Sequence, residues 1–411
     1  MHASGGGQRP VRLTAGEYQL TVNPVDGTQV EPFPPGAGPA HPARYSPEAA
    51  AGHRRATVPP PPPTSDTPPL PLLERDEARE RLVRLLAGGR SVRVSGPSGA
   101  GRTALLDAVA AECGGFAPDG VIRLSGEHRG VTDLMHQLAG AVFAVADLRP
   151  ERPQLLQLLQ EIGAVVVLDD IGFGGAALDE LLQATPECAF LIAAVPSVPA
   201  PSPEADIEEL FLPGLSRGAC LRLLEEAVQR PLAEDERRWA GDLWFESEGL
   251  PLRFVQAGGL LRQRDALRAA ADAVEDETVQ AGYGPDGERP DLVEAPTEAA
   301  PVPLPSLGQS AAPASLLASR ASAPARQALR FALALDGRCP HHAHLPALAG
   351  DTHADTAVAE LAGLGLLTAA GGHYRLAAEV AGQLADQLDT DGGGRTDPLL
   401  AAAQHYTWWS G

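Results

Sequence analysis

The sequence predicts an α/β protein whose first large domain is built on a parallel β-sheet with helices on both faces. Short β-branched runs alternate with helical patterns between residues 73 and 230. One run, at 91–95, leads into a glycine-rich turn, and another, at 164–168, ends on the paired carboxylates Asp169 and Asp170. Alternation of this kind is typical of strand–helix–strand units with right-handed crossovers. We therefore expect a three-layer domain, followed by smaller helical domains.

The glycine-rich turn has the spacing of a phosphate-binding loop. Apart from one position, it matches G-x-x-x-x-G-K-[ST], the motif that cradles phosphate between a strand and a helix N-terminus. Its glycines allow successive backbone N–H groups to point at a phosphate, and the Thr103 hydroxyl is placed to hold Mg²⁺. The predicted phosphate-binding residues are Gly96, Pro97, Ser98, Gly99, Ala100, Gly101, Arg102, Thr103 and Ala104.

The departure from the motif is Arg102, which replaces the usual lysine. The chain contains no lysine, so all 32 of its basic residues are arginine. Arginine keeps the charge, but its planar fork does not reach phosphate oxygens as an ammonium does. We therefore expect Arg102 to support nucleotide binding and to catalyse hydrolysis weakly. The alternative is a glycine-rich turn without a ligand.

The two carboxylates follow the second strand directly. Four branched apolar residues, Val165–Leu168, predict a strand buried on both faces. Ligand chemistry gathers at the carboxyl ends of strands in open α/β sheets. Asp169 is the predicted Mg²⁺ partner, and Asp170 is the candidate for polarising an attacking water. The alternative is an Asp pair that caps the next turn.

Composition limits the remaining possibilities. The chain has 411 residues, enough for two or three domains, and its 44% hydrophobic content supports real cores. A net charge of −21 argues against wrapping of nucleic acid or binding to an anionic membrane. Four scattered cysteines lack disulfide or zinc spacing, and no apolar run reaches the length of a membrane span. We expect a cytoplasmic protein.

Residues 1–72 precede the predicted sheet domain. Tyr18–Val22 and Thr28–Phe33 flank Asp26-Gly27, which predicts a hairpin. Pro34–Pro71 is rich in proline, and we expect a disordered or polyproline-II linker there.

Within 73–230, the periodicity predicts two further strands and four helices. The strands are Val121–Leu124 and Ala189–Val195; the helices are Leu72–Leu86, Val131–Val145, Gln154–Ile162 and Ala176–Gln183.

Two later motifs carry a family resemblance. Leu210-Phe211-Leu212-Pro213-Gly214-Leu215-Ser216 and the apolar helix after it resemble the end of the nucleotide-binding domain of STAND ATPases, the class that includes NB-ARC proteins and bacterial signalling regulators. Gly249-Leu250-Pro251-Leu252 resembles the GLPL motif of that family. The resemblance implies a helical subdomain at 231–273 and places Pro251 against the adenine.

The resemblance extends into the C-terminal third. An acidic, proline-rich linker is expected at 274–311, and a winged-helix domain at 312–390. The predicted winged-helix elements are helices at Arg320–Leu335, Leu345–Leu348 and Ala354–Leu367, then a wing at Tyr374–Leu376. Residues 391–411 are expected to begin another helix, with an amphipathic pattern at Pro398–Trp409.

Two family positions lack their usual residues. The phosphate-sensing histidine expected after the wing falls at Ala377 and Ala378, and the arginine expected after Ala189–Val195 falls at Pro196 and Ser197. With Arg102, these departures predict slow or absent hydrolysis.

The sequence thus predicts an ATP/ADP-binding signalling switch that uses Mg²⁺, with weak ATPase activity. Its partner would be a protein, or a second copy, bound through the winged helix and the C-terminal helix. Alternatives are a nucleotide-bound scaffold that does not hydrolyse ATP, or a DNA-binding regulator. Ser315–Thr390 holds five arginines against seven acidic residues, which disfavours DNA.

Three smaller features have structural and functional interpretations. Cys339, His341, His342 and His344 have residue types that suit zinc but lack finger spacing, so solvated loop histidines are favoured. Trp239, Trp244 and Phe245 are expected to pack between the helical subdomain and its neighbour. For Arg253, a helix-surface role is favoured over a role in phosphate binding.

Overall fold

A computed structural model describes residues 11–15, 18–23, 27–32, 41–56, 69–145, 148–281, 303–352, 354–370, 373–384 and 396–410. The chain forms two compact units. The first comprises Met1–Val58, Glu77–Gly96 and Arg102–Leu212, and the second comprises Pro59–Asp76, Pro97–Gly101 and Pro213–Gly411.

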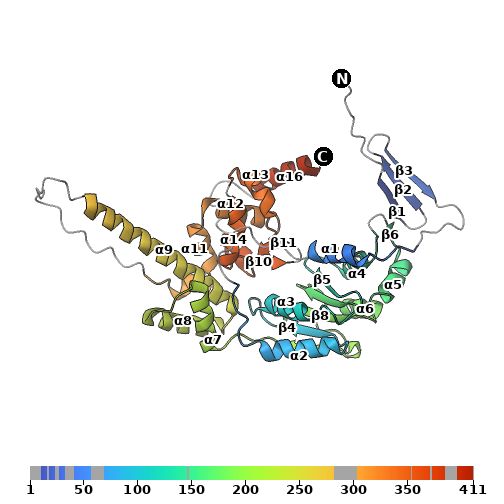
Figure 1. Cartoon of the computed structure of the whole chain (residues 1–411), viewed down its shortest axis with the longest axis horizontal. Coiled ribbons are helices and arrows are strands. Elements are labelled where there is room, and N and C mark those ends of the chain that lie inside the picture. Colours follow the sequence, from blue (N-terminus) through green and yellow to red (C-terminus); the bar gives the residue numbers. More distant parts are fainter. Residues whose placement is uncertain are drawn as a thin grey trace, which may run out of the picture. The chain divides into compact units, whose positions relative to one another are not determined.

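The first unit is organised around a five-stranded parallel sheet (Figure 1). Its strands are β4 (Val92–Ser95), β5 (Val121–Ser125), β7 (Val165–Asp169), β8 (Ala189–Ala194) and β9 (Glu208–Phe211). They are ordered β5-β7-β8-β4-β9, and each neighbouring pair is parallel. The first unit therefore has the fold of P-loop NTPases, as the alternating pattern predicts.

Helices bury both faces of this sheet. On β7, Val166 and Leu168 join an apolar cluster with α4 (Val131–Val142), α5 (Arg152–Gln160) and α6 (Ala176–Ala184). Val165 and Val167 point to the opposite face and are also buried. α3 (Arg102–Glu112) contacts β7 and β8, and α2 (Asp76–Ala87) buries Leu82 and Leu86. Because both faces of the sheet are buried, apolar residues follow one another along the central strands and do not alternate with polar ones.

A second, smaller sheet in this unit extends the predicted hairpin. β2 (Tyr18–Asn23) and β3 (Gly27–Pro32) are antiparallel and close at Asn23 and Gly27. β1 (Val11–Ala15) and the short parallel strand β6 (Leu148–Arg149) complete the order β3-β2-β1-β6, and the sequence patterns predicted neither.

The predicted linker at Pro34–Pro71 contains a helix, α1 (Pro47–Ala56). Three features favour it over an extended chain: proline at the first helical position, a run of three alanines, and a hydrogen bond from Ala49 N–H to the Ser46 hydroxyl at 3.3 Å. Proline content alone misled the prediction, because proline is favoured at the first position of a helix although it disrupts a helix interior.

A 3₁₀ turn, η1 (Pro203–Ala205), precedes β9.

Three helices open the main part of the second unit: α7 (Arg217–Val228), α8 (Glu234–Ser247) and α9 (Pro251–Ala281). Leu223, Leu243 and Phe254, one from each helix, lie in a shared apolar cluster. α9, the long yellow helix of Figure 1, extends eight residues into the region predicted as a linker from 274. Glu275, Glu277, Gln280 and Ala281 in this stretch are good helix formers, and it contains no proline or glycine.

The same unit ends in a small α-helical group with one hairpin. Its elements are α10 (Leu307–Ala311), α11 (Pro313–Arg320), α12 (Ala323–Ala334), η2 (His342–His344), α13 (Leu345–Ala349), η3 (Ala354–Thr356), α14 (Ala357–Gly363), β10 (Leu367–Ala370), β11 (His373–Leu376) and α16 (Thr396–Ser410). We refer to residues 313–384 as the helix–hairpin module. The predicted helix at Arg320–Leu335 begins at Ala323, because Ser322 caps it by accepting from Ala325 N–H at 3.3 Å. That this module is a winged helix stays a prediction.

Within the described residues, no helix has both the length and the apolar content that a membrane span requires.

Candidate functional site

The predicted phosphate loop begins where β4 ends. Gly96 approaches Leu212 so closely that a Cβ atom on it would lie 2.6 Å from the Leu212 carbonyl oxygen. Any larger residue would push the loop away from the end of β9. The requirement for glycine at this position is therefore steric, which the motif alone does not reveal.

The loop residues Pro97–Gly101 form a tight turn. Gly99 has φ +83° and Gly101 has φ +87°, values that favour glycine over other residues. Ala100 N–H donates to the Pro97 carbonyl at 3.2 Å, and Ser98 is half-buried. Two left-handed glycines in three residues give the backbone the freedom to turn its N–H groups, as a phosphate loop requires.

The helix after the loop carries the metal-binding candidate. Thr103, in the first turn of α3, donates its hydroxyl to Asp169 Oδ2 at 2.6 Å. Asp169 ends β7, and its other oxygen, Oδ1, accepts from Asp170 N–H at 2.9 Å. The structure thus brings together the two residues predicted to hold Mg²⁺. A hydroxyl and a carboxylate are oxygen donors of the kind that Mg²⁺ prefers, so this pair fits the ion.

Asp170 follows at the start of the turn after β7. It is half-buried and has φ +56°, a left-handed conformation that Asp adopts more readily than most residues. Gly126, after β5, donates its N–H to the Asp169 carbonyl at 2.7 Å, and a Cβ on Gly126 would lie 2.8 Å from Ile171 Cα. Gly126 is not among the predicted site residues. The available signal was a glycine two residues after the predicted strand Val121–Leu124.

Arg102 lies at the first position of α3. Its Nη1 donates to the carbonyl of Gly96, so the guanidinium contacts the first residue of its own loop. Ala104, the next residue after Thr103, has an exposed side chain and offers the site only its backbone.

Pro251 and the phosphate loop are neighbours within the second unit. Pro251 begins α9, and its Cγ would lie 3.9 Å from a Cβ placed on Gly101. The following residue, Leu252, donates its N–H to the Gly99 carbonyl at 3.2 Å. Arg253 forms an ion pair with Glu379. The partner of Arg253 is thus a carboxylate of the helix–hairpin module.

The positions where STAND proteins carry a phosphate-sensing arginine or histidine hold small or uncharged residues in this chain. Pro196 and Ser197 are exposed just after β8. Ala377 is buried after β11 and donates its N–H to the Leu366 carbonyl at 2.9 Å. Neither Ala377 nor Ala378 has a side chain that reaches a phosphate.

The residues suggested as zinc ligands, Cys339, His341, His342 and His344, have other surroundings in the structure. No group of three or more potential metal ligands gathers anywhere in the described part of the chain. Burial raises the pKa of the Cys339 thiol to about 12, which disfavours the thiolate that zinc needs. His344 Nδ1 instead lies 3.1 Å from His405 Nε2 of α16.

The aromatic residues of α8 differ in how far their side chains are buried. Trp239 donates to the Pro305 carbonyl at 3.0 Å, and Trp244 donates to the Leu215 carbonyl at 2.9 Å, so both serve packing as expected. Phe245 is 77% exposed, and the expectation that it packs inside was wrong. Trp244 and Phe245 are adjacent, and successive helix residues point about 100° apart, so burying Trp244 turns Phe245 toward solvent.

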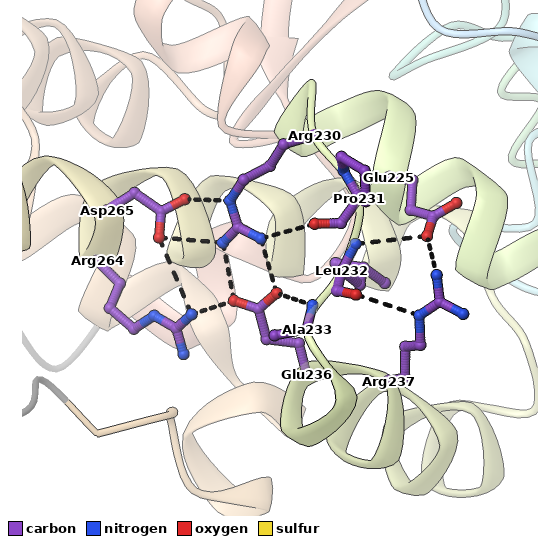
Figure 2. Close-up of polar contacts among 9 residues, drawn as sticks. All are labelled: Glu225, Arg230, Pro231, Leu232, Ala233, Glu236, Arg237, Arg264 and Asp265. Atoms are coloured by element: carbon purple, nitrogen blue, oxygen red, sulfur yellow. Dashed lines mark hydrogen bonds and ion pairs between the residues drawn. The ribbon is translucent and has the colours of Figure 1, made fainter.

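An ion network that no sequence pattern indicated joins the segment after α7 to α8 and α9. Glu236 is 1% exposed and accepts from Arg230 at 2.8 Å on each carboxylate oxygen, with Arg264 adding a further ion pair. Arg230 also binds Asp265 at 2.8 Å. Figure 2 shows the guanidinium groups of Arg230 and Arg264 facing the Glu236 carboxylate. The Arg230 hydrogen bonds hold the pKa of Glu236 down at about 2.

No protein-family model matches this chain, and no curated protein matches it. Among solved structures, it is similar to a Signal Transduction ATPase with Numerous Domains (STAND) with a tetratricopeptide-repeat sensor from Pyrococcus horikoshii, at 11% identity and a TM-score of 0.45. That match covers 86% of this chain and 49% of the other, so this chain spans about half the length of that protein.

Two other solved structures are similar over part of the chain. A RuvB mutant from Thermotoga maritima matches at 15% identity and a TM-score of 0.29, covering 75% of this chain and 94% of the other. A Pif1 helicase, from a structure that addresses the unwinding of forked double-stranded DNA, matches at 15% identity and a TM-score of 0.22. The match covers 41% of this chain and 50% of the other. Likenesses this distant carry no functional argument; the fold assignment rests on strand order and the loop after β4.

Proposed function

We propose that this chain binds ATP and ADP with Mg²⁺ at the Gly96–Ala104 loop and acts as a nucleotide-controlled signalling switch with slow hydrolysis. The observation that carries the proposal is the 2.6 Å hydrogen bond between the Thr103 hydroxyl and the Asp169 carboxylate. It joins a loop-to-helix hydroxyl to a strand-end carboxylate, the two oxygen ligands that magnesium-dependent phosphate sites draw from these positions.

Each site residue has a distinct role in this proposal. Backbone N–H groups from Gly96 to Ala104 and the start of α3 would hold phosphate oxygens. Thr103 and Asp169 would hold Mg²⁺, which neutralises phosphate charge when bound. Asp170 would orient water, and Pro251, next to Gly101, would contact the base.

Slow turnover follows from three local features. Arg102 donates to the Gly96 carbonyl, and a planar guanidinium replaces the point charge of a lysine. Pro196 and Ser197 provide no cation after β8, and Ala377 and Ala378 provide no phosphate-reaching side chain. Fewer positioned cations mean less stabilisation of charge developing on a transferring phosphoryl group.

The switch part of the proposal requires the two nucleotides to differ in their affinity for two conformations. The resemblance to STAND proteins suggests that ADP favours a closed chain and ATP an open one. The helix–hairpin module and α16 are the surfaces proposed to bind a protein partner or a second copy.

The experiment is to denature the purified protein, identify any released nucleotide by chromatography, and measure steady-state phosphate release with ATP and Mg²⁺. We expect stoichiometric ADP and slow turnover. Thr103→Ala should lose Mg²⁺-dependent binding. Thr132→Ala, an exposed threonine of α4, is the matched control and should behave as wild type. Absence of bound nucleotide, with no thermal shift on adding ATP or ADP, would contradict the proposal.

A second candidate is a nucleotide-stabilised scaffold that never hydrolyses ATP. The contact between Arg102 and its own loop carbonyl favours it. Bound nucleotide with no phosphate release above a protein-free control would select the scaffold over the switch.

A further inference from the structure

The first turn of α9 is attached to the phosphate loop by backbone contacts. Leu252 N–H donates to the Gly99 carbonyl at 3.2 Å, and a Cβ on Gly99 would lie 3.1 Å from Leu252 Cβ. A displacement of the Gly99 peptide therefore alters a hydrogen bond of α9 and the close approach of Gly99 to the Leu252 side chain.

The next residue along α9 is attached to the helix–hairpin module. Arg253, whose side chain is 16% exposed, pairs with Glu379, which is 55% exposed. Glu379 comes just after β11 and has φ +65°, so its backbone turns in the left-handed region to present this carboxylate. Successive residues of one helical turn thus contact the loop and the module.

Other residues of α9 contact the module further along the helix. Gln256, fully buried, donates to the Gly365 carbonyl at 3.1 Å, and Arg262 donates to the Gly363 carbonyl at 2.6 Å. A Cβ on Gly259 would lie 3.0 Å from a Leu364 methyl carbon. Each step of three residues in the series 253, 256, 259 and 262 falls about 60° short of a full turn, so these contacts form a stripe that winds gradually around α9.

The contacts of this interface differ in how easily they separate. Breaking those of Gln256 and Gly259 would expose buried groups or open a cavity, which is costly. The Arg253–Glu379 pair is partly solvated, so its charges can rehydrate on separation. The pair is therefore the releasable end of the interface, and it is the end nearest the phosphate loop along the chain.

We propose that the Arg253–Glu379 ion pair couples the nucleotide state of the phosphate loop to the helix–hairpin module through the first turn of α9. The inference rests on the proposed nucleotide-binding function and names its regulation. Arg253 is a positioning residue here: it contacts a carboxylate of the module and acts on the loop through Leu252. Linkage then requires that breaking the pair change the relative affinity for ADP and ATP.

The test uses the full chain with Arg253→Glu, Glu379→Arg and the double charge swap. Dissociation constants for ADP and a non-hydrolysable ATP analogue are measured with Mg²⁺, and hydrogen exchange is followed over 373–384. Each single variant should shift the ratio of the two constants by roughly fivefold and speed exchange at 373–384. The double variant, which restores opposite charges, should return both readouts toward wild type.

Arg84→Glu is the control, because Arg84 forms an exposed ion pair with Glu80 on α2. It should change neither readout. Glu379→Gln guards against misfolding of the charge-reversed variants and should shift the ratio in the same direction by a smaller factor.

Single variants that leave the affinity ratio unchanged would overturn the inference, even if exchange at 373–384 rises, because the pair would then be only structural. Failure of the double swap to recover the ratio would also overturn it. A wild-type chain that binds neither nucleotide is a different failure: it defeats the proposed function itself, and this inference with it.

Discussion

Two carboxylates of this protein, Asp169 and Glu236, lie in different surroundings. Asp169 accepts from the Thr103 hydroxyl and from the Asp170 N–H at a half-buried strand end. Glu236 is buried between the guanidinium groups of Arg230 and Arg264. The Asp169 carboxylate lies half-buried at the carboxyl end of a central strand, and the Glu236 carboxylate is buried between helices.

The difference separates a binding role from a structural one. Arginines already neutralise Glu236, so its carboxylate joins α8 to α9 and to the segment after α7 and has little capacity for a ligand. The Thr103 hydroxyl and the Asp170 N–H orient the Asp169 carboxylate at the carboxyl end of β7, where oxygen donors suit a Mg²⁺ ion. Substitutions at Asp169 should therefore affect ligands, and substitutions at Glu236 should affect folding.

The largest expected effect is on stability at Glu236. Glu236→Ala leaves two guanidinium groups without their shared carboxylate in a buried interface and should lower the free energy of unfolding by about 3–5 kcal/mol. Urea unfolding followed by circular dichroism measures it. A loss below about 1 kcal/mol would remove the contrast with Asp169.

The corresponding substitution at the carboxyl end of β7 is Asp169→Asn. It keeps the shape of the side chain and removes the charge, so Mg²⁺-dependent nucleotide affinity should fall roughly 10- to 100-fold. The free energy of unfolding should change by no more than about 2 kcal/mol. Calorimetric titration with and without Mg²⁺ gives the first value. Equal affinities for wild type and variant would contradict the metal-binding role of Asp169.

The pH dependence of stability sharpens the comparison. The folded-state pKa of Glu236 is lowered from 4.5 to about 2, so its contribution is present above pH 4.5 and is lost as the pH falls toward 2. The shift corresponds to a contribution on the order of 3 kcal/mol. The stability difference between wild type and Glu236→Gln should therefore narrow across this window. A difference that stays constant from pH 5 to pH 2.5 would refute this account of Glu236.

Arg102→Lys tests the loop itself. A lysine ammonium is a flexible point charge that reaches phosphate oxygens, so ATP turnover should rise on the order of tenfold. Affinity for ADP should change much less. Phosphate release that stays at the wild-type rate would show that Arg102 is not what limits hydrolysis.

The smallest effect is expected at the edge of the helical network. Arg237 pairs with Glu225 at 3.1 Å, but its side chain is 51% exposed (Figure 2). Arg237→Ala should lower the free energy of unfolding by about 1 kcal/mol or less, because solvent screens the pair. A loss as large as that of Glu236→Ala would show that exposure does not decide the contribution of these ion pairs.

The parallel sheet and the contact between Thr103 and Asp169 follow from the sequence. Apolar runs define the strands locally, and parallel strands bring their carboxyl ends to one edge, where the loop after β4 and the end of β7 carry polar residues. The antiparallel pairing of β2 with β3 was also predicted, and Asp26 of its predicted turn lies outside the described residues.

Other features depend on contacts that leave no local pattern. Glu236 and Arg264 lie 28 residues apart on two helices, and no spacing rule links them. The high proline content of 34–71 predicted a linker, although Pro47 begins the helix α1. The acidic composition after 273 also predicted a linker, although α9 continues to Ala281. The pairing of Arg253 with Glu379 required the fold of the second unit, since 126 residues separate them.

The most direct test of the central claim is a calorimetric titration of the nucleotide-free wild-type chain with ADP, in Mg²⁺ and again in excess EDTA, beside Asp169→Asn. The account predicts one ADP per chain, tight binding only in Mg²⁺, and the same weak affinity for wild type in EDTA and for the variant in Mg²⁺. Binding of equal strength in all three titrations would show that Thr103 and Asp169 hold no magnesium, and would contradict the proposed site.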